Sequence, residues 1–425
     1  MTDFKTLSNQ QLQQLKDSLL DQYHGFKSRG ITLDITRGKP CSEQLDLALE
    51  MLDCVNSRDY QTEDGMDSRN YGGVDGIPEA KKLFSQYLEV TPEEIIIGGN
   101  SSLNLMHDTF MRAMIKGVSD DGPPWGKLPK IKFLCPSPGY DRHFFICDYL
   151  GLEMIPVEMN AAGPDMDVIE KMVAEDESIK GIWCVPKYSN PTGAVYSDEV
   201  VDRLASMPTK AADFRIFWDN AYTVHHLDDK PARLKNILAA CKKAGNPDRV
   251  LIFGSTSKIA FAGSGVAMMA GSEKNMALLR KQISFQTIGP DKLNQLRHVK
   301  FFRDMAGIQN HMQKHRAILK PKFDAVQSVL QEELAGKNIA QWSNPAGGYF
   351  VSIDTMEGCA AAVVELAAEA GVKLTPAGST YPYMQDPLDR NIRIAPSFPP
   401  VKDVLAAMQL LCICIQLVSI DKLMN

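Results

Sequence analysis

Short apolar segments alternate with amphipathic ones through the middle of the chain, and this alternation limits the possible folds more than any other feature. From about residue 77 to residue 270, the segments EIIIGG, KIKFLC, EMIPVEM, GIWCVP, FRIFWD and RVLIFG are rich in apolar residues. Helical or turn segments separate them. Strands that are buried on both faces have this composition, because helices cover both sides of a parallel sheet. The sequence therefore predicts an α/β fold with a three-layer, mostly parallel sheet.

The two ends of the chain follow another pattern. Ser8 and Gln11 fit a capping box at the start of a segment with leucines at helical spacing, and Gly30 can end that helix. After Gly271 the chain is strongly helical to about residue 335. The segments GGYFVSIDT, GVKLTP and NIRIAPS then predict strands, with a helix between the first two. We expect a smaller α+β unit in this region.

Composition and charge favour a small-molecule ligand. A chain of 425 residues with 44% hydrophobic and 23% charged residues is long enough for a large core and more than one domain. Its formal net charge is -6, and no block of lysine and arginine stands out. Neither a nucleic acid nor an anionic membrane surface is therefore an obvious partner.

The cysteines and the chain ends indicate a cytoplasmic protein. The nine cysteines are scattered, without the C-x-x-C pairs of a zinc or redox site, which is typical of reduced core thiols. The first residues, MTDFKTLSNQQ, lack the basic and apolar regions of a secretory signal. Gln409 and Gln416 interrupt the apolar stretch VLAAMQLLCICIQLVSI. We expect a docked helix there rather than a membrane span.

Five polar or Gly/Pro-rich loops follow predicted strands. They are GGNSS, PSPGY, PKYSNPTG, DNAY and STSK. In open α/β sheets, ligands bind outside the carboxyl ends of the strands. We therefore expect these loops to converge on one ligand site.

One of these loops places Lys258 in unusual surroundings. Small or hydroxylic residues precede it, and Ile259, Ala260 and Phe261 follow it. A poorly solvated lysine has a lowered pKa and can act as an imine-forming nucleophile or as a proton carrier. The alternative is a lysine that closes a strand and points at water, and the run alone does not decide between the two.

Other loops offer partners for an anion. Asn100, Ser101 and Ser102 lie where a strand leads into a helix, so that hydroxyls and free N–H groups can face an anion. Asparagine and serine are also among the commonest helix caps. Ser255 and Ser257 add hydroxyls at the same edge, and the segment GSTSK lacks the spacing of a Walker A loop.

A further set of side chains could hold a flat, cationic ring. Asp219 ends an apolar strand, where it is either a capping carboxylate or an acceptor for a protonated ring nitrogen. Tyr222 can reach the same ligand. Asn190 precedes Pro191 in a fixed turn that is compatible with a cis bond, and Tyr140 could cover a ring with its aromatic face. With the lysine, these groups complete the inventory of a site for a phosphorylated aromatic aldehyde.

The loops occur in the order YGG, GGNSS, SPGY, NPTG, WDNAY, S-x-S-K and NIRIAPS through nearly the whole chain. In this combination the sequence resembles the fold-type I pyridoxal-phosphate-dependent aminotransferases. The segments TRGKP, RNYGGVDG, GGNSSLNLMHD, KYSNPTG, FWDNAY, STSKIAFAGSG and QTIGPDKLNQLRH are most similar to a bacterial-type aspartate aminotransferase subgroup. The resemblance implies pyridoxal 5'-phosphate as the cofactor, and the reaction of aspartate with 2-oxoglutarate to give oxaloacetate and glutamate.

The resemblance also implies a role for each matching residue. Lys258 would form the imine with the cofactor, and Asp219 would bind its pyridine nitrogen. Tyr222 and Asn190 would hydrogen-bond the ring hydroxyl oxygen, and Tyr140 would stack on the ring. The positions on the phosphate side would be Asn100, Ser101, Ser102, Ser255 and Ser257, with Tyr71 reaching the phosphate from a neighbouring subunit.

Two carboxylates of the substrate would need two cations. Arg393 matches the arginine that binds the α-carboxylate, and its planar guanidinium suits bidentate binding. Arg37, Gly38 and Lys39 belong to a loop that the resemblance places over the substrate. For the second carboxylate we favour Arg37 over Lys39, because guanidinium can bind both oxygens. The alternative is a solvated basic turn.

The sequence departs from the family pattern at one position. Many relatives carry an arginine eight residues after the lysine, where it pairs with the cofactor phosphate, but this chain has Val266. Lys292 or Arg297 could supply the missing charge across a subunit boundary.

The resemblance further implies how the chain is divided and assembled. Residues 61–305 would form a large cofactor-binding domain, and residues 1–60 and 306–425 would together form a small one. Two chains would form a homodimer with shared active sites. We expect no metal site, because His225 and His226 more plausibly pack beside a strand end.

Three alternatives remain open at this point. The same cofactor residues would serve an aminotransferase of aromatic or other amino acids, or a pyridoxal-phosphate-dependent lyase. Some bacterial regulators carry an aminotransferase-like effector-sensing domain behind a DNA-binding helix-turn-helix. The present chain has only one helix before the aminotransferase-like region and no basic N-terminal domain, which argues against a regulator.

Overall fold

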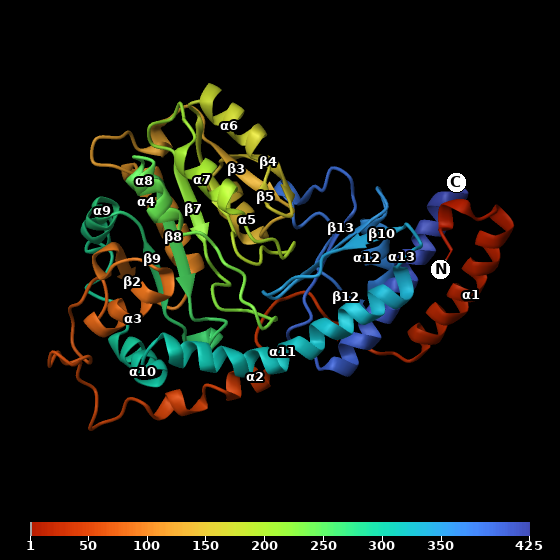
Figure 1. The fold of residues 1–425 in the computed structure, drawn as a ribbon, viewed down its shortest axis with the longest axis horizontal. Helices are drawn as coiled ribbons and strands as arrows, with labels where there is room; N and C mark the ends of the chain where they lie inside the picture. Colours follow the sequence, from red (N-terminus) through yellow and green to blue (C-terminus); the bar gives the residue numbers. More distant parts are fainter. Residues whose placement is uncertain (1) are drawn as a thin grey trace.

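The computed structural model describes residues 2–425, and an eight-stranded sheet forms the centre of its larger part (Figure 1). In spatial order the strands are β2 (Ile95–Ile97), β9 (Ala267–Ala270), β8 (Val250–Ser255), β7 (Arg215–Asp219), β6 (Ile179–Cys184), β3 (Lys132–Ser137), β4 (Glu153–Asn160) and β5 (Gly163–Pro164). The strands from β8 to β4 in this order are parallel to one another. β9 is antiparallel to both β2 and β8, and β5 is antiparallel to β4. The predicted α/β fold with a mostly parallel sheet is confirmed.

Successive residues of the central strands pack on opposite faces of this sheet. In β7, Ile216 and Trp218 belong to one hydrophobic cluster and Phe217 to another. Both faces are therefore covered, which explains why the strands are apolar throughout. The helices of this part are α3 (Pro78–Leu88), α4 (Ser102–Lys116), α5 (Asp141–Tyr149), α6 (Met166–Glu175), α7 (Asp198–Ser206), α8 (Ile237–Lys243), α9 (Glu273–Ile283) and α10 (Lys292–Phe302).

The second, smaller part of the molecule includes segments from both chain ends and contains two small sheets. β11 (Val351–Thr355) lies between β10 (Ala340–Trp342) and β13 (Asn391–Ile394) and is antiparallel to both. β1 (Leu33–Asp34) pairs in parallel with β12 (Val372–Lys373). This second pairing brings the N-terminal segment next to the C-terminal region.

Three long helices complete the second part. α1 (Asn9–Ser28) begins with the predicted capping box of Ser8 and Gln11. α13 (Val401–Met424) packs against α1 and against α11 (Met305–Leu334). In Figure 1, α11 extends from α10 near the large sheet to the end of the molecule where α1 and α13 lie side by side. The shorter helices here are α2 (Ser42–Asp46) and α12 (Ala360–Glu369).

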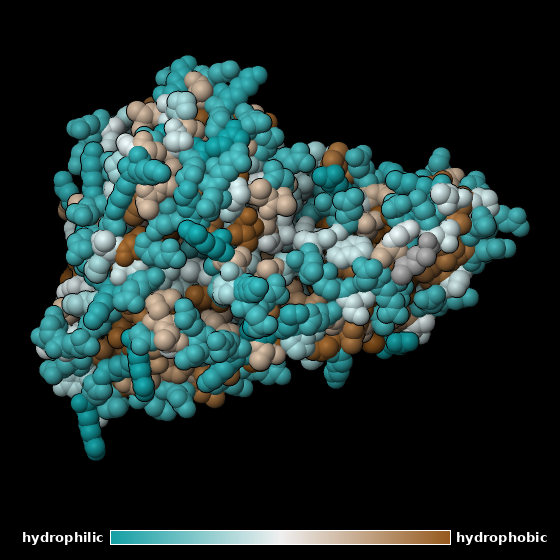
Figure 2. All heavy atoms as spheres, viewed as in Figure 1, coloured by the Kyte–Doolittle hydropathy of each residue, from teal (hydrophilic) through white to brown (hydrophobic). Residues whose placement is uncertain are grey.

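Helix α13 is a core helix of this fold. Among the described residues it is the one helix long and apolar enough to cross a membrane, but 72% of its most apolar window is buried inside the protein. It packs with the N-terminal helix and the small sheets in one hydrophobic cluster. The face shown in Figure 2 is mostly hydrophilic, with separate hydrophobic patches.

Candidate active site

A cavity of about 570 Å³ lies at the carboxyl ends of the parallel strands, where the predicted loops converge. Most of the residues singled out from the sequence line it together. They are Arg37, Gly38, Lys39, Ser101, Ser102, Tyr140, Asn190, Asp219, Tyr222, Ser255, Ser257, Lys258 and Arg393.

Lys258 lies in a tight turn directly after β8. The N–H groups of Ile259 and Ala260 both donate to the carbonyl oxygen of Thr256, at 2.8 and 2.9 Å. The lysine Nζ lies 5.2 Å from the ring centroid of Tyr222. Burial lowers the pKa of the Lys258 ammonium, and the Asp219 carboxylate opposes this shift. Lys258 is therefore a more available base than a solvated lysine.

Asp219 ends β7 and is only 3% exposed. Its Oδ2 lies 3.1 Å from Nε2 of His143, and the His143 ring stacks on Trp183 at a centroid distance of 4.1 Å. Its Oδ1 is buried and has no hydrogen-bond partner within residues 2–425. A buried carboxylate oxygen without a donor is costly, so Asp219 is suited to accept a hydrogen bond from a bound ligand.

Arg393 lies at the cavity wall, and its guanidinium is only weakly hydrogen-bonded by the surrounding residues. Its guanidinium donates to Asp141, Asn190 and Thr375 at 3.3 to 3.4 Å, and it lies 5.1 Å from the centroid of the Phe350 ring. These contacts are long, and Nε has no partner in the described chain. The guanidinium can therefore still bind a carboxylate. The peptide bond after Asn190 is cis, as its turn sequence allowed.

The hydroxyl groups gather where β8 ends and α4 begins. Ser101 is the N-cap of α4, and its side chain accepts the N–H of Leu103. Ser257 donates to the carbonyl oxygen of Asn100 at 3.2 Å. The Asn100 side chain accepts the N–H of Gly265 at 2.5 Å. Asn100 therefore braces this corner and lies outside the cavity lining, whereas the serines face the cavity.

Other predicted residues also lie outside this cavity within the described chain. Tyr71 is 80% exposed. Val266 is buried, and its N–H donates to the Thr256 hydroxyl. The ammonium of Lys292 donates to the carbonyl oxygen of Gly72 at 2.8 Å, next to Tyr71. Lys292 thus supports the loop that bears Tyr71, and Arg297 instead donates to Ser264 and Asn294.

The sequence reasoning missed several residues of the site. His143 is one, because its contact with Asp219 joins positions that are far apart in the chain. Arg142 also lines the cavity, and its place in the first turn of α5, after a predicted loop, was a signal that could have been used. Phe350 is another, and it packs against the loop of Arg37, Gly38 and Lys39, since a Cβ on Gly38 would lie 2.6 Å from the ring.

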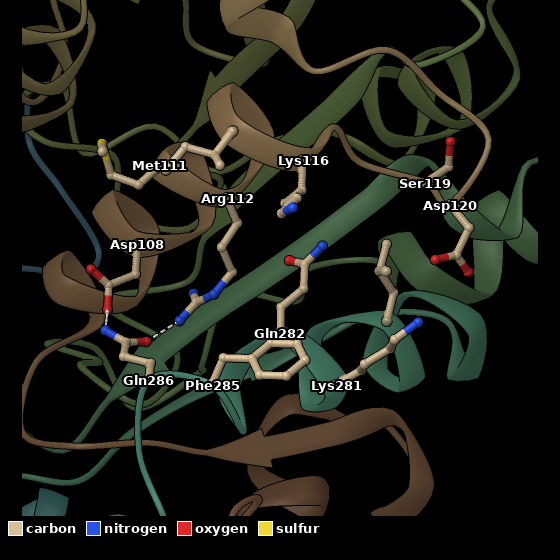
Figure 3. Close-up of a pocket in the computed structure, with 12 residues that line it drawn as sticks. Asp108, Met111, Arg112, Lys116, Ser119, Asp120, Lys281, Gln282, Phe285 and Gln286 are labelled. Atoms are coloured by element: carbon tan, nitrogen blue, oxygen red, sulfur yellow. Dashed lines mark hydrogen bonds between the residues drawn. The ribbon is translucent and has the colours of Figure 1, made fainter.

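A second cavity of about 550 Å³ lies between α4 and α9 (Figure 3). Its polar side chains bond to one another, because Gln286 donates to Asp108 at 2.9 Å and accepts from Arg112. Most of the residues predicted for cofactor or substrate binding line the cavity at Lys258. The cavity at Lys258 is therefore the candidate active site.

Comparison with known proteins shows the family of this chain. The family model of aspartate amino-transferases matches residues 7–425. An aspartate aminotransferase of Corynebacterium glutamicum is 45% identical over 404 residues, which cover 95% of this chain and 93% of that protein. The crystal structure of an aspartate transaminase from the same species has a TM-score of 0.97 and 43% identity, covering 99% of both chains.

A more distant structure shares the fold. α-Aminoadipate aminotransferase from Thermus thermophilus, in complex with a phosphopyridoxyl-leucine compound, has a TM-score of 0.71 at 20% identity, covering 91% of this chain and 92% of that one. The present chain belongs to the aspartate aminotransferase family and is an aminotransferase of fold type I.

Proposed function

We propose that this aminotransferase uses pyridoxal 5'-phosphate to convert aspartate and 2-oxoglutarate into oxaloacetate and glutamate. The observation that carries the proposal is that Lys258 and Asp219 line one cavity, and that Oδ1 of Asp219 has no hydrogen-bond partner among the described residues. Family membership supports the reaction class, and the proposal adds the cofactor, the substrates and the role of each residue.

The residues present fit this cofactor. The buried Oδ1 of Asp219 can accept a hydrogen bond from a protonated pyridine nitrogen, and His143 fixes the other oxygen. Serine hydroxyls and the N-terminus of α4 offer donors for a phosphate. When bound, the cofactor carries the amino group and withdraws electrons from the substrate Cα.

The protein side chains would orient the ligands and move the proton. Lys258, with its lowered pKa, would take the proton from the substrate Cα and deliver it to the cofactor carbon. Burial holds the pKa of Tyr222 far above its usual value, so its hydroxyl keeps its proton and donates to the ring oxygen together with Asn190. Tyr140 would cover the ring, and Arg393 would bind the α-carboxylate.

The substrate preference would come from cations on the loop before α2. Arg37 and Lys39 both line the cavity, but the Lys39 ammonium lies 3.9 Å from the centroid of the Phe398 ring. That contact occupies one face of the lysine head. Arg37 is our choice for the distal carboxylate of aspartate, because its guanidinium can bind both oxygens.

A screen of single amino acids tests the proposal directly. The protein loaded with pyridoxal phosphate is mixed with one amino acid at a time, and the cofactor absorbance is followed until the amino group has been transferred. Aspartate and glutamate should react fastest, and Lys258→Ala should not react. Faster reaction with an aromatic amino acid would contradict the assigned substrates, and release of ammonia would indicate a lyase.

We also propose that the enzyme is a cytoplasmic homodimer in which Tyr71 reaches the phosphate in the partner subunit. Its side chain is 80% exposed, on a loop braced by Lys292. Residues 61–305 would form the large domain, and 1–60 with 306–425 the small one.

Mixed dimers test the shared site. Inactive Lys258→Ala and Tyr71→Phe chains should regain activity when they exchange subunits, because one of the two sites in the mixed dimer then has both residues intact. Unchanged activity after proven exchange, with a severe Tyr71→Phe defect, would contradict the shared site.

A further inference from the structure

We infer that Gln44, His315 and His311 form a buried positioning network that fixes the backbone of Lys258 and links it to the loop bearing Arg37. The inference rests on the proposed role of Lys258. It concerns residues that lie behind the lysine, outside the cavity lining.

The carbonyl groups of Lys258 and Ile259 are bonded by side chains rather than by a helix or a strand. Nε2 of His311 lies 2.8 Å from the Ile259 oxygen. The Tyr349 hydroxyl donates to the Lys258 oxygen at 3.3 Å, and Nε2 of His225 lies 3.3 Å from the same atom. These donors come from α11, from the segment before β11 and from the loop after β7. A shift of any of these three parts would move the base of the lysine side chain.

The hydrogen bonds of Gln44 determine where the protons lie in this network. The N–H of Cys41 donates to Oε1 of Gln44 at 3.1 Å, so the amide nitrogen faces inward. It lies 2.9 Å from Nδ1 of His315 and 3.0 Å from the Tyr349 hydroxyl. Nδ1 of His315 is therefore an acceptor, and the proton of the neutral ring is on Nε2.

The two imidazole rings meet beside the carbonyl group of Ile259. Nε2 of His311 lies 2.8 Å from the Ile259 oxygen, and Nε2 of His315 lies 3.0 Å from Nε2 of His311. Burial, with a smaller contribution from the neighbouring His311, lowers the pKa of His315 to about 3. Burial also lowers the pKa of His311. Both rings are therefore neutral at pH 7.

The polarity of this network is costly for a protein core. Gln44 and His315 are 0% exposed, and His311 is 5% exposed. Well-packed apolar side chains of the same shape are often at least as stabilising as buried polar groups. The hydrogen bonds therefore contribute a defined geometry at the lysine turn, beyond what packing alone would supply.

The network also reaches the substrate side of the cavity through α2. This helix bears Gln44 and begins three residues after Lys39. The loop of Arg37 and Lys39 is also held by the segment after β13, because Ser397 donates to the Lys39 oxygen at 3.0 Å. Thr375 likewise donates to the Thr36 oxygen at 2.9 Å. The loop of Arg37 and the turn of Lys258 are thus fixed to each other through Gln44.

The test compares four variants of the holoenzyme. His311→Leu removes the donor to Ile259, whereas His311→Gln places an amide nitrogen near the position of Nε2. Gln44→Leu breaks the middle of the network. Gln416→Leu is the control, since Gln416 is 1% exposed and bonds the Cys412 oxygen and the Lys337 ammonium, both outside the lysine turn.

Four quantities separate positioning from general stability. They are kcat and KM for aspartate, the pH midpoint of the absorbance of the Lys258-linked cofactor, and hydrogen exchange of the segment 253–267 in the protein without cofactor. His311→Leu should lower kcat about tenfold or more, because misplacing a catalytic group is expensive. It should also shift the pH midpoint and speed exchange, with a smaller change in KM. His311→Gln should restore most of each quantity, and Gln44→Leu should change them in the same direction as His311→Leu.

Measurements on the His311→Leu variant, the control variant and the wild-type protein can each contradict the network or the proposed function. An unchanged kcat and pH midpoint in His311→Leu, or equal changes in Gln416→Leu, would overturn the network. If His311→Leu does not fold, Gln44→Leu is compared with Gln416→Leu by the same quantities, and equal changes in these two variants would overturn the network. If the wild-type protein shows no absorbance that depends on Lys258, the proposed function fails instead, and the failure is distinguishable from that of the network.

Discussion

The two sides of the active-site cavity are built from different chemistry. We define the hydroxyl side by Ser101, Ser102, Ser255 and Ser257, which gather at the start of α4 and the end of β8. We define the cation side by Arg37, Lys39, Arg142 and Arg393, which line the same cavity from the loop before α2, the first turn of α5 and β13. Lys258 and Asp219 belong to neither side.

The difference indicates how this chain distributes its positive charge. An anion on the hydroxyl side would be bound by neutral donors and by the partial positive charge of a helix N-terminus. Val266 contributes no charge there, and Lys292 and Arg297 bond elsewhere in the described chain. The full charges of the cation side suit a substrate with two carboxylates. On this view the arginines set substrate preference, and the cofactor phosphate depends mainly on hydrogen bonds and on a partner subunit.

The largest effect is expected between the two sides, at Lys258. Lys258→Ala should retain the fold but lose turnover by roughly a thousandfold or more, because both the covalent link and the proton carrier are removed. Steady-state kinetics and borohydride reduction of the bound cofactor would measure the two losses. A borohydride-reducible link in the variant would show that another lysine bears the cofactor.

Asp219→Asn should have the next largest effect. An amide cannot hold a ring nitrogen protonated as a carboxylate does, so kcat should fall roughly a hundredfold or more, as for one broken member of a buried charge pair. Cofactor binding should persist, because both sides of the cavity are intact. Absorbance and kcat measured on the same sample would separate these outcomes, and near-normal turnover would reduce Asp219 to a strand-end cap.

Arg37→Leu probes the cation side alone. Removing one partner of a desolvated charge pair costs about 2 to 5 kcal/mol, so kcat/KM for aspartate should fall on the order of 30-fold or more. The loss should be much smaller for alanine and phenylalanine, which lack the distal carboxylate.

Arg142→Leu is the matched variant for this prediction. Arg142 lines the same cavity but lies in the first turn of α5, and Arg142→Leu should change aspartate kinetics less than Arg37→Leu does. A larger effect of Arg142→Leu than of Arg37→Leu would show that Arg142 binds the distal carboxylate. Equal losses for all three amino acids in Arg37→Leu would show that this arginine supports the loop.

Local patterns were sufficient to predict much of the fold. The continuous apolar runs became the central parallel strands, since burial on both faces leaves no polar alternation. The antiparallel strand β9, which lies between β2 and β8, was not predicted, because AMMA is short and follows a Gly-rich loop. The pairing of β1 with β12 was also missed: each strand has two residues, and only the tertiary fold brings them together.

The candidate site likewise contains residues that could not be predicted from local sequence patterns. Lys258 and Asp219 could be placed in one cavity because each follows a buried parallel strand, and such strands end at one edge of a sheet. His143 could not be found in this way, since its function depends on a contact across 76 positions of the chain. Asn100 was assigned to the ligand from its loop, but its side chain accepts a backbone N–H from Gly265. Whether a polar side chain faces a ligand or braces a loop depends on contacts that are distant in sequence.

The smallest expected effect lies on the hydroxyl side, at Ser257. Its hydroxyl already donates to the Asn100 oxygen at 3.2 Å, so a bound phosphate gains this donor only in exchange for that bond. Ser257→Ala should therefore weaken cofactor affinity by roughly tenfold at most, the value of one hydrogen bond, while kcat at saturating cofactor is unchanged. Ser264→Ala is the control, because Ser264 bonds Arg297 outside the cavity and should leave affinity unaltered. Equilibrium titration of the cofactor-free protein would measure both. A rise in the KM for aspartate without a loss of cofactor affinity would place Ser257 on the substrate, and the division of the cavity into a hydroxyl side and a cation side would then be wrong.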